Sequence, residues 1–436
     1  MEEPDRDDMS VTAVAAAEER GDTRQRLIDA AVDLFLTVGY PNLRVVDITN
    51  HAGVGKGTFY LYFKSKRDLL LAYFRHIMDV VDRTANPMVA AATDYFEREG
   101  IRISGSLERG VNWNSMLTFL RISAGSPDPQ VVLAARELRE RIGGLPGRDL
   151  AEAISAGVSR PVDTELATLM IVGMTEALAW RSRQDDAYDA PVTAAFLRDL
   201  HRRTLTILAD DDPRLIQARA MVQRSELVER AIDDALPGTV AGAEAVDTRQ
   251  RIVDSAVDLL HRVGYGSLRV DDITEHAGVG KGTFYHHFDS KQDVLLAFFE
   301  RVARNIEDVE DRIAAAEIDY LSKVALRMRL WLEPSRHWDR IVTFARIMAG
   351  SDSPEIAGGG RQVFRSLVDA GKRDIEQAMT AGLVRQLDSE LAVTAILGMG
   401  EVLVWRAGQD DVYDPATILA FMADMFCRAF LVAPAD

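Results

Sequence analysis

Apolar side chains recur at intervals of three and four residues along most of the chain, the spacing that gathers them on one face of an α-helix. Residues 23–38 are a clear example, with apolar side chains at Leu27, Ala30, Ala31, Leu34, Phe35 and Val38. Two short helices are expected after it, over about 45–52 and 56–62, joined by the turn Gly53-Val54-Gly55. No strand-like alternation appears, so the pattern predicts an all-α protein.

The same pattern occurs twice, at a fixed offset. Asp22 matches Asp247, and 247 − 22 = 225. About 37 of 53 positions are identical between residues 22–74 and 247–299, and the offset also pairs Trp180 with Trp405 far downstream. Two copies are too few for a solenoid, so we expect a duplicated complete unit.

This repeat divides the chain into two units, each with a closely matching first part, the head, and a more diverged body. We expect a disordered acidic tail over 1–21, a first head over 22–74, a first body over 75–209, a helical linker over 210–246, a second head over 247–299 and a second body over 300–432. In the linker, Asp212 is a suitable N-cap, Pro213 suits the first helical position, and apolar residues recur up to Ala235. Such a helix is long enough to carry the chain back to the start of the second head.

Within each head, two short helices joined by a glycine-bearing turn form a helix-turn-helix arrangement, in which the second helix enters the major groove of DNA. Residues 52–70 read Ala-Gly-Val-Gly-Lys-Gly-Thr-Phe-Tyr-Leu-Tyr-Phe-Lys-Ser-Lys-Arg-Asp-Leu-Leu, and residues 277–295 repeat them with few changes. This segment is similar to the head signature of TetR-type repressors. The resemblance implies two TetR-like units in one polypeptide and a DNA-binding function.

Residue types in this motif suggest individual roles. Gly53 permits a left-handed turn, Gly57 lets the backbone approach the sugar-phosphate chain, and the residues at the start of the reading helix meet phosphates or base edges. Ser65 is expected to cap the next helix with Asp68 as its partner. The expected DNA contacts are Arg44, Thr49, Lys56, Gly57, Thr58, Tyr60, Leu61, Tyr62 and Lys66 in the first head, with Arg269, Thr274, Lys281, Gly282, Thr283, Tyr285, His286, His287 and Lys291 in the second.

Each assignment has a simpler alternative. The lysines and tyrosines form a solvated helix face if the motif does not bind DNA, whereas Ile48, Phe59 and Phe63 are expected in the core. Arg44 and Arg269 stand where the family commonly has a hydroxyl N-cap, and Gly55 and Gly280 where it commonly has serine. Because His286 and His287 are adjacent, they do not share one helical face, and no metal site or cofactor is indicated.

For the bodies, the resemblance implies a small-molecule site and a four-helix dimer interface. The interface is expected between Glu165–Ser182 with Ala194–Leu208 and Glu390–Ala407 with Thr417–Leu431, where Gly173 and Gly398 permit close helix approach. Since both copies lie in one chain, we expect an intrachain pseudo-dimer. Candidate ligand-lining residues are Trp113, Met116, Phe119 and Met174, with Trp338, Ile341, Phe344 and Met399 in the second body. The alternative for these eight is ordinary core filling.

Composition restricts the function less than the motif does. The net charge of −17 argues against a protein that coats nucleic acid by charge alone, but not against basic residues gathered on one small face. The acidic N-terminal residues and interrupted apolar runs predict a cytoplasmic protein without a membrane span. One cysteine, Cys427, excludes an internal disulfide and is expected to be a buried apolar group.

The leading hypothesis is a ligand-released repressor that binds an imperfect inverted repeat in double-stranded DNA. A sensor or adaptor that kept the fold without binding DNA is the alternative, although both heads retain basic and tyrosine residues. An enzyme is not expected, because Gln184-Asp185-Asp186 is the nearest catalytic candidate and is better explained as a solvated loop. Two chains that associate to present four heads remain a further possibility.

Overall fold

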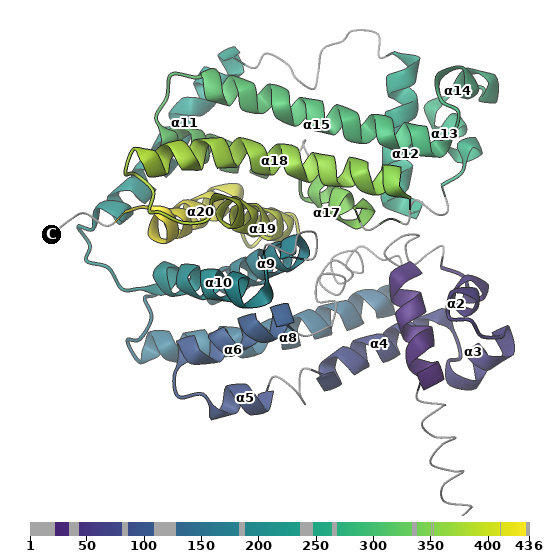
Figure 1. Cartoon of the computed structure of the whole chain (residues 1–436), viewed down its shortest axis with the longest axis horizontal. Coiled ribbons are helices and arrows are strands. Elements are labelled where there is room, and N and C mark those ends of the chain that lie inside the picture. The colour runs from purple at the N-terminus through teal and green to yellow at the C-terminus, as the bar shows by residue number, and fades with distance from the viewer. Residues whose placement is uncertain are drawn as a thin grey trace, which may run out of the picture.

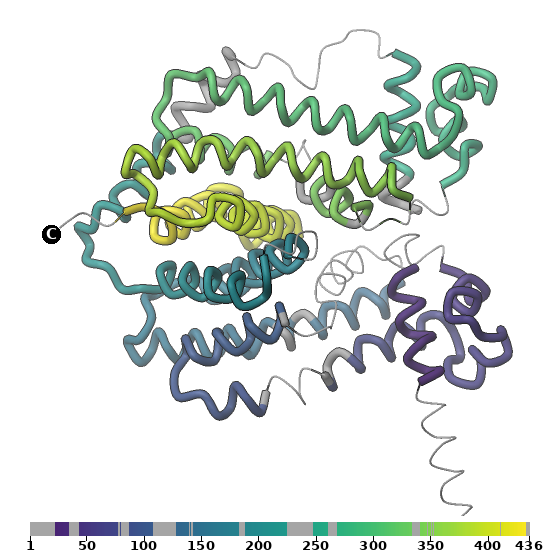
Figure 2. Tube along the Cα trace, in the orientation of Figure 1, coloured from purple at the N-terminus to yellow at the C-terminus, as the bar shows by residue number. Residues whose placement is uncertain are grey.

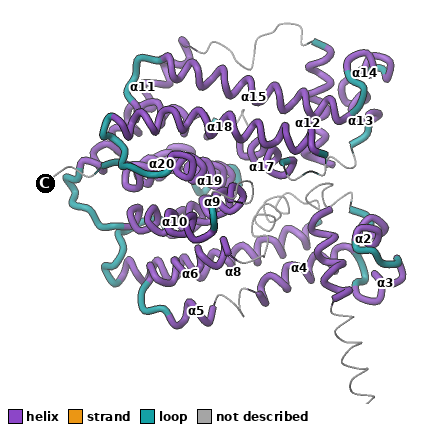
Figure 3. The backbone as a smooth tube through the Cα atoms, viewed as in Figure 1, coloured by secondary structure: helices purple, strands orange, loops and turns teal. Residues whose placement is uncertain are grey.

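The computed structural model describes residues 22–34, 43–80, 86–108, 128–182, 188–235, 247–263, 268–333, 338–349, 351, 353–409 and 411–432. Helices account for nearly all of the regular structure in these ranges, which contain no strand (Figure 3). None of the described helices is long and apolar enough to cross a membrane. The expected N-terminal tail lies outside the described residues.

The first unit begins with a helix over residues 22–34. It continues with α2 (Val45–His51), α3 (Lys56–Tyr62), α4 (Lys66–Val80), α5 (Asn86–Ala91), α6 (Tyr95–Glu108), α8 (Pro129–Ser155), α9 (Thr164–Ser182) and α10 (Ala190–Leu205). The linker helix is α11 (Pro213–Ala235). The second unit contains α12 (Thr248–Val263), α13 (Val270–Ala277), α14 (Lys281–His287), α15 (Lys291–Ala315), α16 (Tyr320–Leu332), α17 (Trp338–Met348), α18 (Pro354–Thr380), α19 (Ser389–Ala407) and α20 (Pro415–Phe430).

Helix starts follow capping signals that both units share. The Asp189 carboxylate accepts a hydrogen bond from the Val192 N–H at 2.8 Å, and its counterpart Asp414 accepts one from the Thr417 N–H at 2.7 Å. Each aspartate also has a proline within the first two helical positions after it, where the missing N–H has no intrahelical partner to lose. The last helix of each unit therefore begins at an equivalent position.

The linker helix α11 covers the range that the sequence predicted. It packs against α16 and α20 of the second body, at the end of the molecule where the chain's C-terminus lies (Figure 2). The side chains of Leu215, Ala218 and Met221 are buried. The Met221 Sδ atom lies 3.5 Å from the Sγ atom of Cys427, which is buried as expected. The linker is thus anchored to the body of the unit that it precedes in sequence.

The centre of the molecule is a four-helix packing of α9 and α10 from the first unit with α19 and α20 from the second (Figure 1). At the crossing of α9 and α19, a Cβ atom added at Gly173 would lie 2.4 Å from the Gly398 carbonyl oxygen, and the reverse distance is also 2.4 Å. Only glycine lets the two backbones approach this closely. The expected intrachain pseudo-dimer and the role of these glycines are confirmed.

Ion pairs across this centre occur in sets of two, and the residues of one ion pair are related to those of the other by the 225-residue offset. Arg160 Nη2 lies 2.5 Å from Asp424 Oδ2, and the equivalent Arg385 Nη2 lies 2.7 Å from Asp199 Oδ2. A second reciprocal set joins Arg181 to Glu390 and Arg406 to Glu165. Reciprocal contacts of this kind define an isologous, twofold interface, here formed within one polypeptide.

One charged group in the centre is almost completely enclosed. The Arg346 side chain, 4% exposed, contacts Glu176 of the first unit at 3.2 Å and also pairs with Glu401 of the second. The Thr343 hydroxyl donates to Glu401 at 2.7 Å. Glu176 and Glu401 are equivalent positions, so this arginine bridges the two units close to their pseudo-twofold axis.

The two heads lie at the same end of the molecule, on opposite sides of the central four helices (Figure 1). The helices α8 and α4 lead to the first head, and α18 and α15 extend alongside the second. Because the bodies are joined through the centre, the separation of the two heads depends on the packing of the bodies.

Candidate DNA-binding heads

Each head is a small helical cluster around two phenylalanines from its reading helix, α3 or α14. Phe59 and Phe284 are fully buried, and Phe63 and Phe288 nearly so. Ile48 and Ile273, from the preceding short helices, are also fully buried. Burying these side chains fixes which face of the reading helix is left for solvent or DNA.

The turn between the two short helices depends on a left-handed residue. Gly53 has a φ angle of +67°, and its counterpart Gly278 has +64°. A side chain in that conformation would be strained, so glycine is required for the tight turn. The reading helices then begin after Gly55 and Gly280, neither of which provides a side-chain cap.

The helix after the first reading helix has the predicted cap at Ser65, and the second head has the equivalent cap at Ser290. The Ser65 hydroxyl accepts a hydrogen bond from the Asp68 N–H at 3.2 Å, and the Ser290 hydroxyl accepts one from the Asp293 N–H at 3.3 Å. In the first head the Asp68 carboxylate also accepts from the Lys64 N–H at 3.0 Å. These bonds hold the end of the reading helix at a defined angle to the next helix.

The exposed face of each reading helix carries the predicted contact residues. Tyr60 is 54% exposed, Leu61 is 82% exposed, and Tyr285 of the second head is 56% exposed. The other exposed or half-buried members of the predicted set on these helices are Lys56, Gly57, Thr58, Tyr62, Lys281, Gly282, Thr283, His286 and His287. The sequence thus correctly separated the outer face from the core.

The two heads differ in the charges beside the first lysine of the reading helix. Lys281 Nζ lies 2.7 Å from Asp271 Oδ1, and this hydrogen-bonded carboxylate raises the pKa of Lys281. The first head has the exposed Val46 at the position of Asp271. A DNA phosphate that approached Lys281 would therefore compete with the Asp271 carboxylate. The first head has no carboxylate at the equivalent position, so Lys56 would not face this competition.

The two arginines before the short helices occupy the N-cap position, as expected, without a side-chain cap. Arg44 instead makes two hydrogen bonds to the Asp47 carboxylate, each of 2.7 Å, which lower the pKa of Asp47. In the second head the Arg269 backbone N–H donates to the Asp272 carboxylate at 3.3 Å. Both arginine side chains are exposed at the edge of the head.

Two expected contacts are corrected by burial. Thr49 is 1% exposed and donates its hydroxyl hydrogen to the Val46 carbonyl, and Thr274 is 5% exposed and donates to the Asp271 carbonyl. Both threonines therefore lie in the interior of the head and not on the face that would meet DNA. Lys291 donates to the Leu268 carbonyl at 3.0 Å, and partial burial lowers the pKa of both Lys291 and Lys66.

The predicted ligand-lining residues do not form one site in the described part of the chain. Trp113, Met116 and Phe119 lie outside the described residues, and Trp338 begins α17 with its side chain likewise not described. The remaining four are Met174, Ile341, Phe344 and Met399. Met174 and Met399 are buried core residues, Ile341 packs against the same core, and Phe344 stacks on Phe299 at 5.6 Å. These four residues therefore lie in or against the core, and their role in ligand binding stays a prediction.

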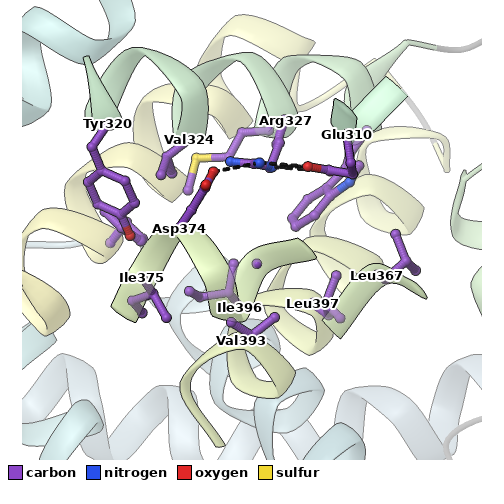
Figure 4. Close-up of a pocket in the computed structure, with 14 residues that line it drawn as sticks. Glu310, Tyr320, Val324, Arg327, Leu367, Asp374, Ile375, Val393, Ile396 and Leu397 are labelled. Atoms are coloured by element: carbon purple, nitrogen blue, oxygen red, sulfur yellow. Dashed lines mark hydrogen bonds and ion pairs between the residues drawn. The ribbon is translucent and has the colours of Figure 1, made fainter. Parts of the chain in front are cut away.

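A cavity of about 50 Å³ lies elsewhere in the second body, between α15, α16, α18, α19 and α20 (Figure 4). Its apolar wall includes Val324, Trp331, Ile396 and Phe426. Arg327 lies in this wall and is flanked by two carboxylates, those of Glu310 and Asp374. The sequence did not indicate this set because it is spread over five helices. None of the four described candidates, Met174, Ile341, Phe344 and Met399, lines it.

The equivalent place in the first body carries more polar side chains. His201 stands at the position of Phe426, and its Nε2 atom lies 2.9 Å from the Tyr95 hydroxyl. Burial lowers the pKa of His201 to about 4, since nothing in the described surroundings neutralises a charged imidazole and Arg202 opposes it. Among the described residues, no hydrogen-bond partner reaches the Nδ1 atom of His201.

We expect His201 to make the protein acid-sensitive. Its folded-state pKa lies below the unfolded value of 6.5, so the unfolded chain binds the proton more tightly and stability falls as the pH drops from 6.5 toward 4. The loss at pH 5 relative to pH 7.5 is about 2 kcal/mol. The His201→Phe variant, which copies Phe426, should lack this component when urea unfolding is followed at both pH values. An unchanged pH dependence in the variant would contradict the assignment.

Comparison with known proteins agrees with this architecture. The model of the family described as bacterial regulatory proteins, tetR family, matches residues 27–73 and 252–298. The fatty acid metabolism regulator protein of Bacillus subtilis is 32% identical over 176 residues, which cover 38% of this chain and 86% of the relative. The transcriptional regulator RutR of Escherichia coli is 28% identical over 183 residues, covering 40% and 81%.

Among solved structures, the fatty acid degradation regulator FadR from Bacillus halodurans is similar, with 25% identity and a TM-score of 0.35 over 41% of this chain and 94% of that one. The two sequence relatives named above are each matched over most of their own length by less than half of this chain. That relation is expected when one polypeptide carries the unit twice. The chain belongs to the tetR family of bacterial regulatory proteins and is a DNA-binding transcriptional regulator with two helix-turn-helix heads.

Proposed function

We propose that a single chain acts as a repressor that binds both halves of an imperfect inverted repeat and is released by a small-molecule effector bound in a body. The observation that carries this proposal is the placement of two equivalent exposed reading helices at one end of an intrachain pseudo-dimer (Figure 1). A twofold reader normally needs two chains, whereas here one chain contains both halves. The tail, heads, bodies and linker are assigned with the boundaries predicted from the sequence.

The proposed base and phosphate contacts are those that the heads expose. Lys56, Tyr60 and Tyr62, with Lys281 and Tyr285 in the second head, approach phosphates, while Leu61 is placed to contact a thymine methyl group. Arg44 and Arg269 approach phosphates at the edge, and Lys66 and Lys291 do so from partly buried positions. The glycines at 57 and 282 allow close backbone approach, with Thr58 and Thr283 beside them. Thr49 and Thr274 are left out because they are buried.

The half-sites are expected to differ because the reading helices differ. Leu61 and Tyr62 of the first head correspond to His286 and His287 of the second, whose imidazole rings lie 5.1 Å apart in an edge-on arrangement. Imidazole donates and accepts hydrogen bonds, whereas leucine offers only apolar contact. The bases under these side chains should therefore differ between the two half-sites.

The test is selection of bound sequences from a pool of randomised duplex DNA, followed by footprinting. The wild-type chain should select two adjacent half-sites that differ at one or two positions. The Leu61→His/Tyr62→His variant, which makes the reading helices alike, should select a symmetric repeat and lose about tenfold to a hundredfold affinity for the wild-type site, since one mismatched pair costs about 1–3 kcal/mol.

The reciprocal His286→Leu/His287→Tyr variant is the matched control and should select the other symmetric repeat. Recovery of one isolated half-site, or an unchanged site in both variants, would contradict the proposal. Mass measurement of the bound and free protein is expected to give one chain of 48.3 kDa. A mass of two chains on one site would favour the assembly with four heads.

A further inference from the structure

The cavity of the second body contains an unbalanced buried charge. Arg327 Nη2 lies 2.6 Å from Glu310 Oε2 and 2.7 Å from Asp374 Oδ2, and all three side chains are 12% exposed (Figure 4). One guanidinium thus faces two carboxylates, leaving one negative charge in excess. The Asp374 Oδ2 atom is enclosed, and within the described part of the chain it has this ion pair but no well-directed hydrogen bond.

The surroundings of this charge are apolar. Val393, Ile396 and Leu397 of α19 lie across the cavity from Arg327, and Trp331 and Phe426 complete the wall. Burial raises the pKa of Tyr320, so its hydroxyl is a neutral polar group at the cavity edge. An excess negative charge in such a setting is unfavourable unless a cation neutralises it.

The first body does not reproduce this arrangement. Arg102 also faces two carboxylates, those of Asp149 and Glu99, but Asp149 has a second cation, because Arg98 Nη1 lies 3.0 Å from its Oδ1 atom. Glu99 stands at the position of the cavity-lining Val324. Glu99 is 3% exposed, and burial raises its pKa. In the second body the second carboxylate is that of Glu310 from α15. The position on α16 that corresponds to Glu99 has the apolar side chain of Val324.

We propose that the second body binds a small organic cation, a primary amine with a short apolar chain, whose ammonium group lies at Asp374 and Glu310 and whose chain lies in the cavity. The proposal rests on the proposed function, in that this amine is the effector class. An anion of the same length would meet two carboxylates, and a neutral alcohol would leave the excess charge uncompensated. A volume of about 50 Å³ holds only a few non-hydrogen atoms, which restricts the chain length.

The test uses three probes of equal length, n-butylammonium, butyrate and 1-butanol, titrated into the full chain by calorimetry and by ligand-observed NMR. Butylammonium is expected to bind at least tenfold more tightly than either of the others. The Asp374→Asn variant should weaken butylammonium binding about tenfold, whereas the matched Asp149→Asn variant in the first body should leave it unchanged. Equal binding of all three probes, or tighter butyrate binding, would overturn the proposal.

Two controls keep the result separate from folding and from DNA binding. The comparison of the three probes on the wild-type chain needs no variant. It therefore tests the proposal even if the Asp374→Asn variant does not fold. Binding to the selected operator without amine tests the proposed function independently. Loss of operator binding with intact amine binding would refute repression alone, and operator binding with no amine preference would refute the amine site alone.

Discussion

Replacement of Arg346 by leucine is expected to destabilise the folded chain by about 3–5 kcal/mol, because it leaves two enclosed carboxylates without their shared cation. Glu176 and Glu401 have side chains only 2% exposed, so water does not replace the lost partner. Urea unfolding followed by circular dichroism measures the change.

A surface ion pair supplies the control for this prediction. Arg136 lies 2.8 Å from Glu140 with both side chains at least 60% exposed, and the Arg136→Leu variant should change stability by less than 1 kcal/mol. Adding Glu176→Gln and Glu401→Gln to Arg346→Leu should recover much of the loss, because neutral amides replace the charges. If the arginine variant matched its surface control, the triad would have no role in holding the units together.

The second large effect is expected at the crossing of α9 and α19. Leucine at position 173 would place side-chain atoms where the Gly398 carbonyl and the Val402 side chain now lie, 2.4 and 2.5 Å from the first added carbon. Since one of these groups is backbone, the helices must separate, and we expect a loss of about 3 kcal/mol in unfolding experiments. Operator affinity should fall as well, because helix separation changes the spacing of the heads.

Gly358 provides the matched control for this substitution. It also lies inside a helix, α18, but a Cβ atom added there meets nothing within 4 Å. Gly358→Ala should therefore stabilise the protein by about 0.5–1 kcal/mol through helix propensity and leave DNA binding unchanged. Equal effects of the two substitutions would show that helix propensity, and not the crossing, governs position 173.

Local features of the heads were predictable because neighbouring residues decide them. The capping serines Ser65 and Ser290, the left-handed Gly53 and the buried Phe59 each follow from residues within four positions in the sequence. The range of the linker helix α11 followed from Asp212, Pro213 and the apolar spacing after them. The error at Thr49 and Thr274 arose because a short helix has too few residues to define its buried face by spacing alone.

The ligand candidates were left open by the sequence for a different reason. Large apolar residues such as Phe344 and Met399 look alike in sequence whether they fill a core or line a cavity, and only packing distinguishes the two cases. The residues that do line the cavity come from five helices and span more than a hundred positions, from Glu310 to Phe426. Their charges, at Glu310, Arg327 and Asp374, showed no local pattern that marked them as neighbours.

The sequence by itself determined the helices, the two heads and the duplication. Helical spacing and caps depend on short segments of the chain, and the duplication follows from direct comparison of the sequence with itself at a fixed offset. Only the tertiary structure decided which charges meet, from the reciprocal Arg160–Asp424 and Arg385–Asp199 pairs to the buried Arg346. It also decided where space remains inside the second body. Contacts between residues far apart in the chain depend on how whole helices pack, and that packing is a property of the complete set of side chains.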